Sequence, residues 1–430
     1  MNWQHSDIAS VVSVLESGSR PKGGATVESG EIPSLGGENI LKHGGVTLEE
    51  VKRVPRKFFD RMTKGHLKNA DVLINKDGAQ TGKVGFYKNN NGANACINEH
   101  LFLIRGDAEK ITQSYLYYSL LSQACQNQIE AQISGSAQPG LKSDFLKGVF
   151  TRIPESIPEQ SKIAEVLSKV DQAIEQTESL IAKQQRIKTG LMQDLLTRGI
   201  DEHGNLRSQE THEFKDSPLG RIPVEWVCSL LSYFVPSAEY GISTSLGDFG
   251  TPVLRMNNFS EGEADVSDLK YTELMPPEKL WLRDGDVLFN RTNSWEHVGR
   301  TGIWRCQIEK ATFASYLVRL NPDPDKLLSE MLNIWLNWEP TQIAMRRMAT
   351  PAVQQVNINP TNLRSIYAAF PTCLSEQGEI GKRLACLRKT ISTNVEGLAK
   401  LRSLKTALMQ DLLTGKKRVT PLMENMEVCS

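Results

Sequence analysis

A stretch of about 45 residues occurs twice in this chain, and this repeat constrains the fold more than any other feature of the sequence. The segment KTGLMQDLLTRG, residues 188–199, returns as KTALMQDLLTGK, residues 405–416, at a constant offset of 217 positions. The same offset aligns Glu159-Gln160 with Glu376-Gln377 and holds back to a proline at the start of each copy. A repeat that keeps register over this length without a gap is a duplicated structural element.

Each copy is predicted to form one long helix. Apolar residues recur at steps of three and four, which places them on one helical face. No proline interrupts either run, and Gly199 and Gly415 follow the last apolar residues as stop signals. The seam is predicted to comprise Ile163, Leu167, Val170, Ile174, Thr177, Ile181 and Leu191 in the first copy, and Ile380, Leu384, Leu387, Ile391, Asn394, Leu398 and Leu408 in the second.

A helix of roughly 38 residues is about 57 Å long and cannot bury a one-sided apolar stripe on itself. We therefore expect the two helices to pair as a coiled coil. The alternative is that each helix separately covers its own neighbouring domain. Thr177 and Asn394 occupy the same repeat position near the middle of each helix, so antiparallel pairing predicts that they are neighbours.

Composition limits the classes of protein to consider. A length of 430 residues predicts several domains, and 39% hydrophobic with 23% charged residues is typical of a soluble globular protein. The seven cysteines contain no CxxC pair, so neither a disulfide framework nor a metal site is expected. No apolar run reaches the length of a membrane span and no signal peptide is evident, which predicts a cytoplasmic protein. Zero net charge argues against a nonspecific polyanion binder.

The segments around the helices form a second, looser repeat. ADVLINKDGAQTGKVGFY, residues 70–87, and GDVLFNRTNSWEHVGRTGIW, residues 285–304, both predict a strand, a turn and a strand. Helices are predicted at residues 112–129 and 326–348. The predicted organisation is a globular block at 1–153, a long helix at 154–199, a linker at 200–222, a second block at 223–370, a second long helix at 371–415 and a C-terminal tail at 416–430.

The sequence contains no motif that predicts catalysis. GxxxxGK[ST], GxGxxG, HExxH and GxSxG are all absent, so no catalytic residue is predicted. The turns of the two blocks do carry side chains suited to base edges, because Arg and Lys pair with guanine while Asn and Gln pair with adenine. An ordinary polar hairpin tip remains the alternative. The candidate DNA-binding residues are Lys76, Gln80, Lys83, Asn290, Arg291, Thr292, Asn293, Ser294 and Arg300.

The chain resembles the specificity (S) subunit of type I restriction-modification enzymes. The resemblance is carried by IPESIPEQSKIAEVLSKVDQAI, KTGLMQDLLTRG and their second copies, by SPLGRIPVEW, and by GDVLFNR with its partner ADVLINK. It implies an α+β fold in which two similar mixed α/β target recognition domains are joined by two long helices forming an antiparallel coiled coil. Two features depart from the family pattern: the first block lacks the SPLGRIP preamble, and the second helix begins with the weaker SEQGEIGKRL.

The resemblance also implies the function. Each domain would read one half of a bipartite double-stranded DNA site, and the helices would act as spacer and dock the modification subunits, two of them being expected. The chain would be the non-catalytic subunit of a restriction endonuclease and adenine methyltransferase complex acting in host defence. S-adenosylmethionine, ATP and Mg²⁺ would belong to the modification and restriction (helicase-nuclease) subunits. The rival interpretations are a self-contained DNA modification enzyme and a protein-binding scaffold with duplicated interaction domains.

Overall fold

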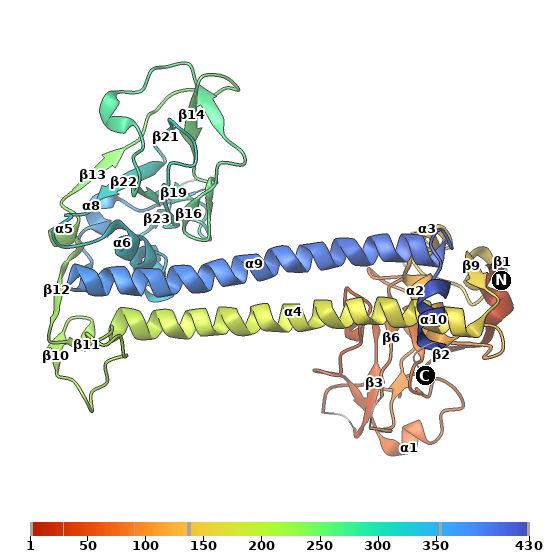
Figure 1. Ribbon diagram of the computed structural model, residues 1–430. Helices are drawn as coiled ribbons and strands as arrows, with labels where there is room; N and C mark the ends of the chain where they lie inside the picture. The colour runs from red at the N-terminus through yellow and green to blue at the C-terminus, as the bar shows by residue number, and fades with distance from the viewer. Residues whose placement is uncertain (1–2, 29, 90, 136–138, 352–354, 428–430) are drawn as a thin grey trace. The chain divides into compact units, whose positions relative to one another are not determined.

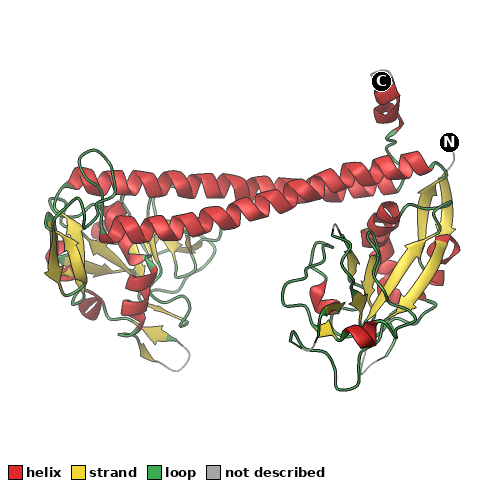
Figure 2. Cartoon of the chain, turned by 90° about the horizontal axis from the view of Figure 1, so that it is seen from below, coloured by secondary structure: helices red, strands yellow, loops and turns green. Residues whose placement is uncertain are grey.

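The computed structural model describes all residues except 1–2, 29, 90, 136–138, 352–354 and 428–430. The chain divides into two compact units, residues 1–179 with 396–430, and residues 180–395. Each unit holds one globular domain together with one end of each long helix. In Figure 2 each domain is a mixture of strands and short helices, and the two long helices are uninterrupted.

The repeated sequence forms the two long helices, α4 (Ile157–Thr197) and α9 (Leu374–Leu413) (Figure 1). Both end where predicted, because Gly199 and Gly415 adopt φ values of 62° and 72°. These lie in the left-handed region, which glycine enters without a Cβ penalty and which stops a helix.

Within each unit the two helices run antiparallel. In the first unit Lys405 pairs with Asp171 at 2.7 Å and Arg402 with Glu178 at 2.6 Å, so the numbers fall along α9 as they rise along α4. The predicted coiled coil is confirmed, and all of its predicted seam residues are buried or half-buried. Ile187 and Leu404, which occupy one repeat position outside that set, are instead 48% and 47% exposed.

The two polar seam residues have partners other than each other. In the second unit the Asn394 amide donates to Gln184 Oε1 at 2.9 Å. In the first unit the Thr177 hydroxyl donates to the Ala173 carbonyl of its own helix at 2.7 Å. The sequence predicted Thr177 as the neighbour of Asn394. Among the hydrogen bonds of the described residues, the partner of Asn394 is instead Gln184, which lies two helical turns beyond Thr177 on α4.

The domain of the first unit is built on an antiparallel sheet in the order β2-β8-β5-β6. A smaller sheet has the order β4-β3-β7, and β1 pairs with β9 just before α4. The strands are β1 (Trp3–Asp7), β2 (Val12–Ser17), β3 (Ile32–Leu35), β4 (Arg53–Val54), β5 (Val72–Asn75), β6 (Val84–Phe86), β7 (Cys96–Ile97), β8 (Leu101–Gly106) and β9 (Phe150–Pro154). The short helices are α1 (Arg56–Phe59), α2 (Gln113–Leu121) and α3 (Gln123–Ala131), with 3-10 turns η1 (Ile8–Val11), η2 (Gly37–Asn39) and η3 (Phe145–Gly148).

The domain of the second unit repeats this order of strands. Its main sheet runs β13-β22-β18-β20 and continues into β16 and β15, its smaller sheet runs β17-β14-β21, and β12 pairs with β25 just before α9. A further small sheet has the order β19-β24-β23. The looser sequence repeat is therefore a repeat of topology.

The strands of that unit are β12 (Trp226–Leu230), β13 (Ser237–Tyr240), β14 (Thr251–Leu254), β15 (Phe259–Ser260), β16 (Glu263–Ala264), β17 (Lys270–Thr272), β18 (Val287–Asn290), β19 (Thr292–Asn293), β20 (Thr301–Ile303), β21 (Thr312–Phe313), β22 (Leu317–Asn321), β23 (Thr350–Pro351), β24 (Val356–Asn357) and β25 (Tyr367–Pro371). Its short helices are α5 (Leu231–Phe234), α6 (Ser329–Leu336), α7 (Glu339–Arg346) and α8 (Pro360–Leu363), with the 3-10 turn η4 (Glu278–Leu280).

Two predicted helices are each divided in the structure, and the predicted linker and tail each contain regular secondary structure. The helix predicted at 112–129 is two helices, because the Ser122 side chain accepts the Cys125 N–H and starts a new helix. The helix predicted at 326–348 likewise divides between α6 and α7. The predicted linker contains the hairpin of β10 (Phe214–Ser217) and β11 (Gly220–Pro223). The predicted tail contains α10 (Thr420–Glu427), preceded by Val419, which is only 1% exposed in the core of the first unit.

Each long helix begins on one domain and ends on the other. Leu412 and Leu413 of α9 are buried in the core of the first unit, and Leu195 and Leu196 of α4 are buried in the core of the second. This arrangement differs from the alternative in which each helix covers only its own neighbouring domain. Among the described residues, no helix combines the length and the apolar character needed to cross a membrane.

The repeated Glu-Gln pair fastens the start of each helix. The Gln160 amide donates to the carbonyls of Lys110 and Pro154 at 2.8 and 3.0 Å, and its oxygen accepts from Thr112 N at 2.8 Å. Gln377 makes the same three bonds with Lys326, Pro371 and Leu328. The glutamine is therefore the same in both copies because it makes the same hydrogen bonds at the start of each helix.

Candidate nucleic-acid interface

The turn that holds the candidate residues lies at one edge of each main sheet. In the second unit β13 and β18 end at this edge and β22 begins there, and in the first unit β2 and β5 end there and β8 begins. In the second unit Asn290 of β18 lies opposite Leu317 of β22, and Arg291 N donates to the Tyr316 carbonyl at 3.1 Å. In the first unit Lys76 N donates to the His100 carbonyl at 2.8 Å in the same way. The two turns therefore occupy corresponding places, and we call them the first and the second strand-end face.

Among the candidates of the second face, Asn290 is displaced from the surface. Its side chain is fully buried, and its amide donates to the Met256 carbonyl at 2.8 Å. Asn290 therefore holds the turn and is not placed to contact a ligand, contrary to the prediction. Thr292 and Asn293 form β19, whose Thr292 hydroxyl accepts from the Asn357 amide at 3.0 Å. Ser294 and Arg300 are exposed.

Arg291 is the candidate with the clearest geometry. Its guanidinium lies over the Tyr240 ring, 5.1 Å from the ring centroid. Two further aromatic side chains are about half exposed: Tyr316, whose carbonyl accepts the Arg291 N–H, and Trp295, which follows β19 in the chain, with 50% and 55% exposure. The sequence reasoning missed Tyr240 and Tyr316, because they come from β13 and the start of β22, whose pairing with β18 leaves no local signature.

The first face carries different side chains at the corresponding place. Lys76 turns inward, with Nζ 3.3 Å from the Glu99 carbonyl and 5.6 Å from the Phe102 ring centroid. His100 Nδ1 lies 2.6 Å from Asp77 Oδ1, and Arg20 pairs with Glu99 at 2.7 Å. This face thus presents a histidine and an arginine that each pair with a carboxylate, whereas the second presents an arginine over an aromatic ring.

The remaining candidates of the first face bind each other. Lys83 Nζ donates to Gln80 Oε1 at 2.9 Å. Partial burial, followed by the charge of Lys42, lowers the pKa of Lys83. Both side chains lie at the surface of the turn, so the predicted contact of these two residues with DNA stays a prediction.

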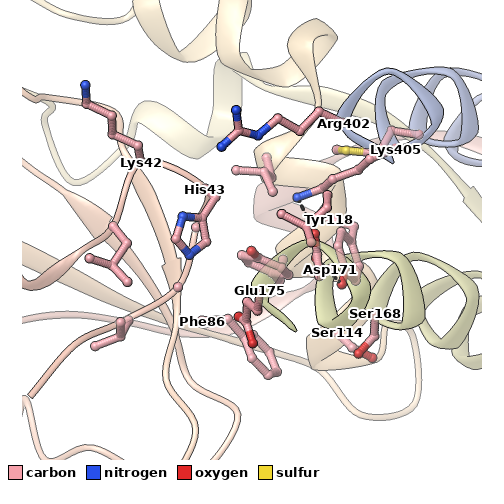
Figure 3. Close-up of a pocket in the computed structure, with 18 of the residues that line it drawn as sticks. Lys42, His43, Phe86, Ser114, Tyr118, Ser168, Asp171, Glu175, Arg402 and Lys405 are labelled. Atoms are coloured by element: carbon pink, nitrogen blue, oxygen red, sulfur yellow. Dashed lines mark hydrogen bonds and ion pairs between the residues drawn. The ribbon is translucent and has the colours of Figure 1, made fainter. Parts of the chain in front are cut away.

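A groove separates each domain from the helix pair. In the first unit it is a pocket of about 490 Å³ lined by Lys42 and His43 of the domain and by charged side chains of both helices (Figure 3). At its centre Asp171 accepts from the Tyr118 hydroxyl at 2.7 Å and pairs with Lys405 at 2.7 Å. Figure 3 shows Lys405 reaching from α9 toward Asp171 on α4.

In the corresponding groove of the second unit, the repeated lysine pairs with a different carboxylate. Lys188, the repeat equivalent of Lys405, pairs with Glu261 of the β15–β16 turn at 2.8 Å. Arg388 stands where the first copy has Asp171, and it donates to the Glu261 carbonyl at 3.1 Å. The repeated lysine therefore pairs with a carboxylate of the facing helix in the first unit and with a carboxylate of the domain in the second unit. Among the described residues, an ion pair of this repeated lysine links the second domain to its helices, and the first domain has no equivalent.

The Glu261–Lys188 pair gives a pH-dependent prediction. The hydrogen bond from Lys188, and then its charge, lower the pKa of Glu261 below the ordinary value of 4.5. The stabilisation is fully present above pH 4.5 and is lost as the pH falls through the lowered pKa. Because the Glu261 side chain is 65% exposed, we expect a coupling energy below about 1 kcal/mol. A double-mutant cycle of Lys188→Met and Glu261→Gln measures it, and coupling that persisted at pH values below the lowered pKa would contradict the assignment.

Comparisons with known proteins show which sequences this chain is similar to. Residues 1–184 match the family model described as the type I restriction modification DNA specificity domain. The chain is 24% identical over 359 residues to the MjaVIII type I restriction enzyme specificity subunit of Methanocaldococcus jannaschii, which covers 82% of this chain and 80% of that one. It is 28% identical over 214 residues to the putative MjaX specificity subunit of the same organism, a match that spans about half of either chain, 49% and 50%.

A solved structure shares the fold. The type I restriction-modification S subunit from M. genitalium aligns with a TM-score of 0.61 over 96% of both chains, at 16% sequence identity. A second structure, from a study of complex assembly and conformational transition of the type I R-M system, aligns with a TM-score of 0.55 over 96% of this chain and 98% of that one, also at 16% identity. At such low identity these likenesses concern the fold alone.

Proposed function

We propose that this chain, which belongs to the specificity subunits of type I restriction enzymes, reads a two-part sequence of double-stranded DNA, one part with each domain. The observation that carries this proposal is the pair of strand-end faces. They occupy the same place in two domains of the same topology, yet one presents Arg291 over the Tyr240 ring and the other presents His100–Asp77 and Arg20–Glu99. Equal scaffolds with unlike contact residues fit two readers of different base sequences.

We assign the chemistry to partner subunits. Methyl transfer from S-adenosylmethionine would lie in two modification subunits, and ATP-dependent translocation and Mg²⁺-dependent cleavage in restriction subunits. The chain has no net charge, so the partners would also supply much of the contact with DNA phosphates.

The outer faces of the long helices support docking of two like partners. Ile187 and Leu404 occupy one repeat position and are 48% and 47% exposed, although each lies on a helix whose apolar residues are otherwise mostly covered. Exposed apolar side chains at equivalent positions suit two copies of the same modification subunit. The grooves beside these positions differ in charge, so we expect the two contacts to be similar without being identical.

The test is reconstitution with the cognate modification subunits. The chain is co-expressed with them in a methylation-free host, and the methylated positions are sequenced across the genome. We expect methylation at a split sequence, two short defined parts separated by a gap of fixed length. Methylation at the same sequence when this chain is omitted would contradict the proposal, and a complex with no sequence preference would favour the scaffold interpretation.

A further inference from the structure

We propose that Arg291 reads a guanine in the part of the DNA bound by the second domain, and that Tyr240 positions its guanidinium for this contact. The inference rests on the proposed function and adds to it the base that is recognised, the residue that recognises it and the domain in which this occurs.

The backbone of Arg291 is held from both sides. Its N–H donates to the Tyr316 carbonyl at 3.1 Å, and its carbonyl accepts from Ile358 N at 2.8 Å. The preceding residue, Asn290, is fully buried and bonded to Met256. The side chain therefore projects from a rigid point at the end of β18, which is what a base contact of defined register requires.

The guanidinium is held by a ring and keeps its terminal nitrogens for a ligand. The Arg291 guanidinium lies 5.1 Å from the centroid of the Tyr240 ring, a cation–π contact that restrains its position. Its Nε is buried and has no hydrogen-bond partner among the residues that the structure describes, which leaves the terminal amino groups as the donors for a ligand. Two parallel donors in one plane match O6 and N7 of guanine in the major groove, the commonest specific arginine contact.

Other arginines of the same domain are committed to the protein. Arg319 is buried and paired with Glu239 and Asp286, and Arg305 is paired with Glu330. The ion pairs found among the described residues do not include Arg291. At the corresponding place of the first face, Lys76 is turned toward the Glu99 carbonyl. Among these four cations, Arg291 is therefore the one whose geometry suits a guanine contact.

The experiment uses the reconstituted complex with its modification subunits and compares methylated sequences. We expect Arg291→Gln to relax the requirement for one guanine, with discrimination falling by roughly 10- to 100-fold at that position. The other part of the sequence stays unchanged. Arg291→Lys keeps the charge without the two-pronged geometry and should lose most of that discrimination, while Tyr240→Ala should lose part of it and Tyr240→Phe should retain it.

The matched control is Arg283→Gln, an exposed arginine that precedes β18 at the opposite end of the strand from Arg291. We expect it to methylate the wild-type sequence. The inference is overturned if Arg291→Gln keeps the full sequence requirement, or if it relaxes both parts equally, since that result indicates a general loss of binding. A wild-type complex that methylates without any sequence preference overturns the proposed function instead, so the two failures are distinguishable.

Discussion

Replacing Glu376 with alanine is expected to lower the free energy of unfolding by about 3–5 kcal/mol, because it leaves a buried arginine without its counter-charge. Glu376 accepts from Arg207 at 2.6 and 3.0 Å, from the Trp226 indole at 3.3 Å and from Ile200 N at 3.1 Å. Arg207 is only 6% exposed, so water cannot replace the lost carboxylate. Urea unfolding followed by far-ultraviolet circular dichroism measures the effect.

Two comparisons make this prediction specific. Glu379→Ala removes a carboxylate from the same helix whose pair with Arg383 is 44% and 36% exposed, and we expect a change below about 0.5 kcal/mol. Glu159, the repeat equivalent of Glu376, is fully buried and bonded to Arg418, but Arg418 is 31% exposed and can rehydrate. We therefore expect a smaller loss for Glu159→Ala than for Glu376→Ala. Equal, small losses in Glu376→Ala and Glu379→Ala would contradict the role of the buried pair.

Lengthening both long helices by one turn is expected to widen the gap between the two parts of the DNA sequence by about one or two base pairs. Four inserted residues add about 6 Å of helix at 1.5 Å per residue, and a base pair of B-DNA occupies about 3.4 Å. Suitable sites are after Ala182 in α4 and after Val395 in α9, near the level of the Asn394–Gln184 bond. Sequencing of methylated positions gives the gap directly.

The controls separate helix length from chain length. The same four residues inserted between Glu202 and His203, which are exposed beyond the end of α4, should leave the gap unchanged. Insertion into one helix only should break the pairing and reduce methylation. A wild-type gap in the doubly lengthened chain would show that the helices do not set the spacing.

The sequence by itself determined the elements that depend on local pattern. Apolar residues three and four apart, with a glycine after the last of them, gave the two long helices and both of their ends, and the constant offset gave their equivalence. The repeated Glu-Gln pair was visible as identity, although its reason appears only in the bonds of Gln160 and Gln377. The predicted helix boundaries were wrong where a side chain caps a new helix, as Ser122 does for α3. Such a cap depends on a single hydrogen bond, which the apolar pattern does not reveal.

Only the tertiary structure decided which side chains meet at the candidate interface. Tyr240, Arg291 and Tyr316 lie on or beside three strands that are far apart in the sequence, and sheet pairing across such distances has no periodic signature. The same limit applies to burial, since nothing local distinguishes the interior Asn290 from its neighbour Arg291. It applies equally to the ion pairs of the repeated lysine. Lys188 pairs with a carboxylate in a turn of the domain, whereas Lys405 pairs with a carboxylate on the facing helix.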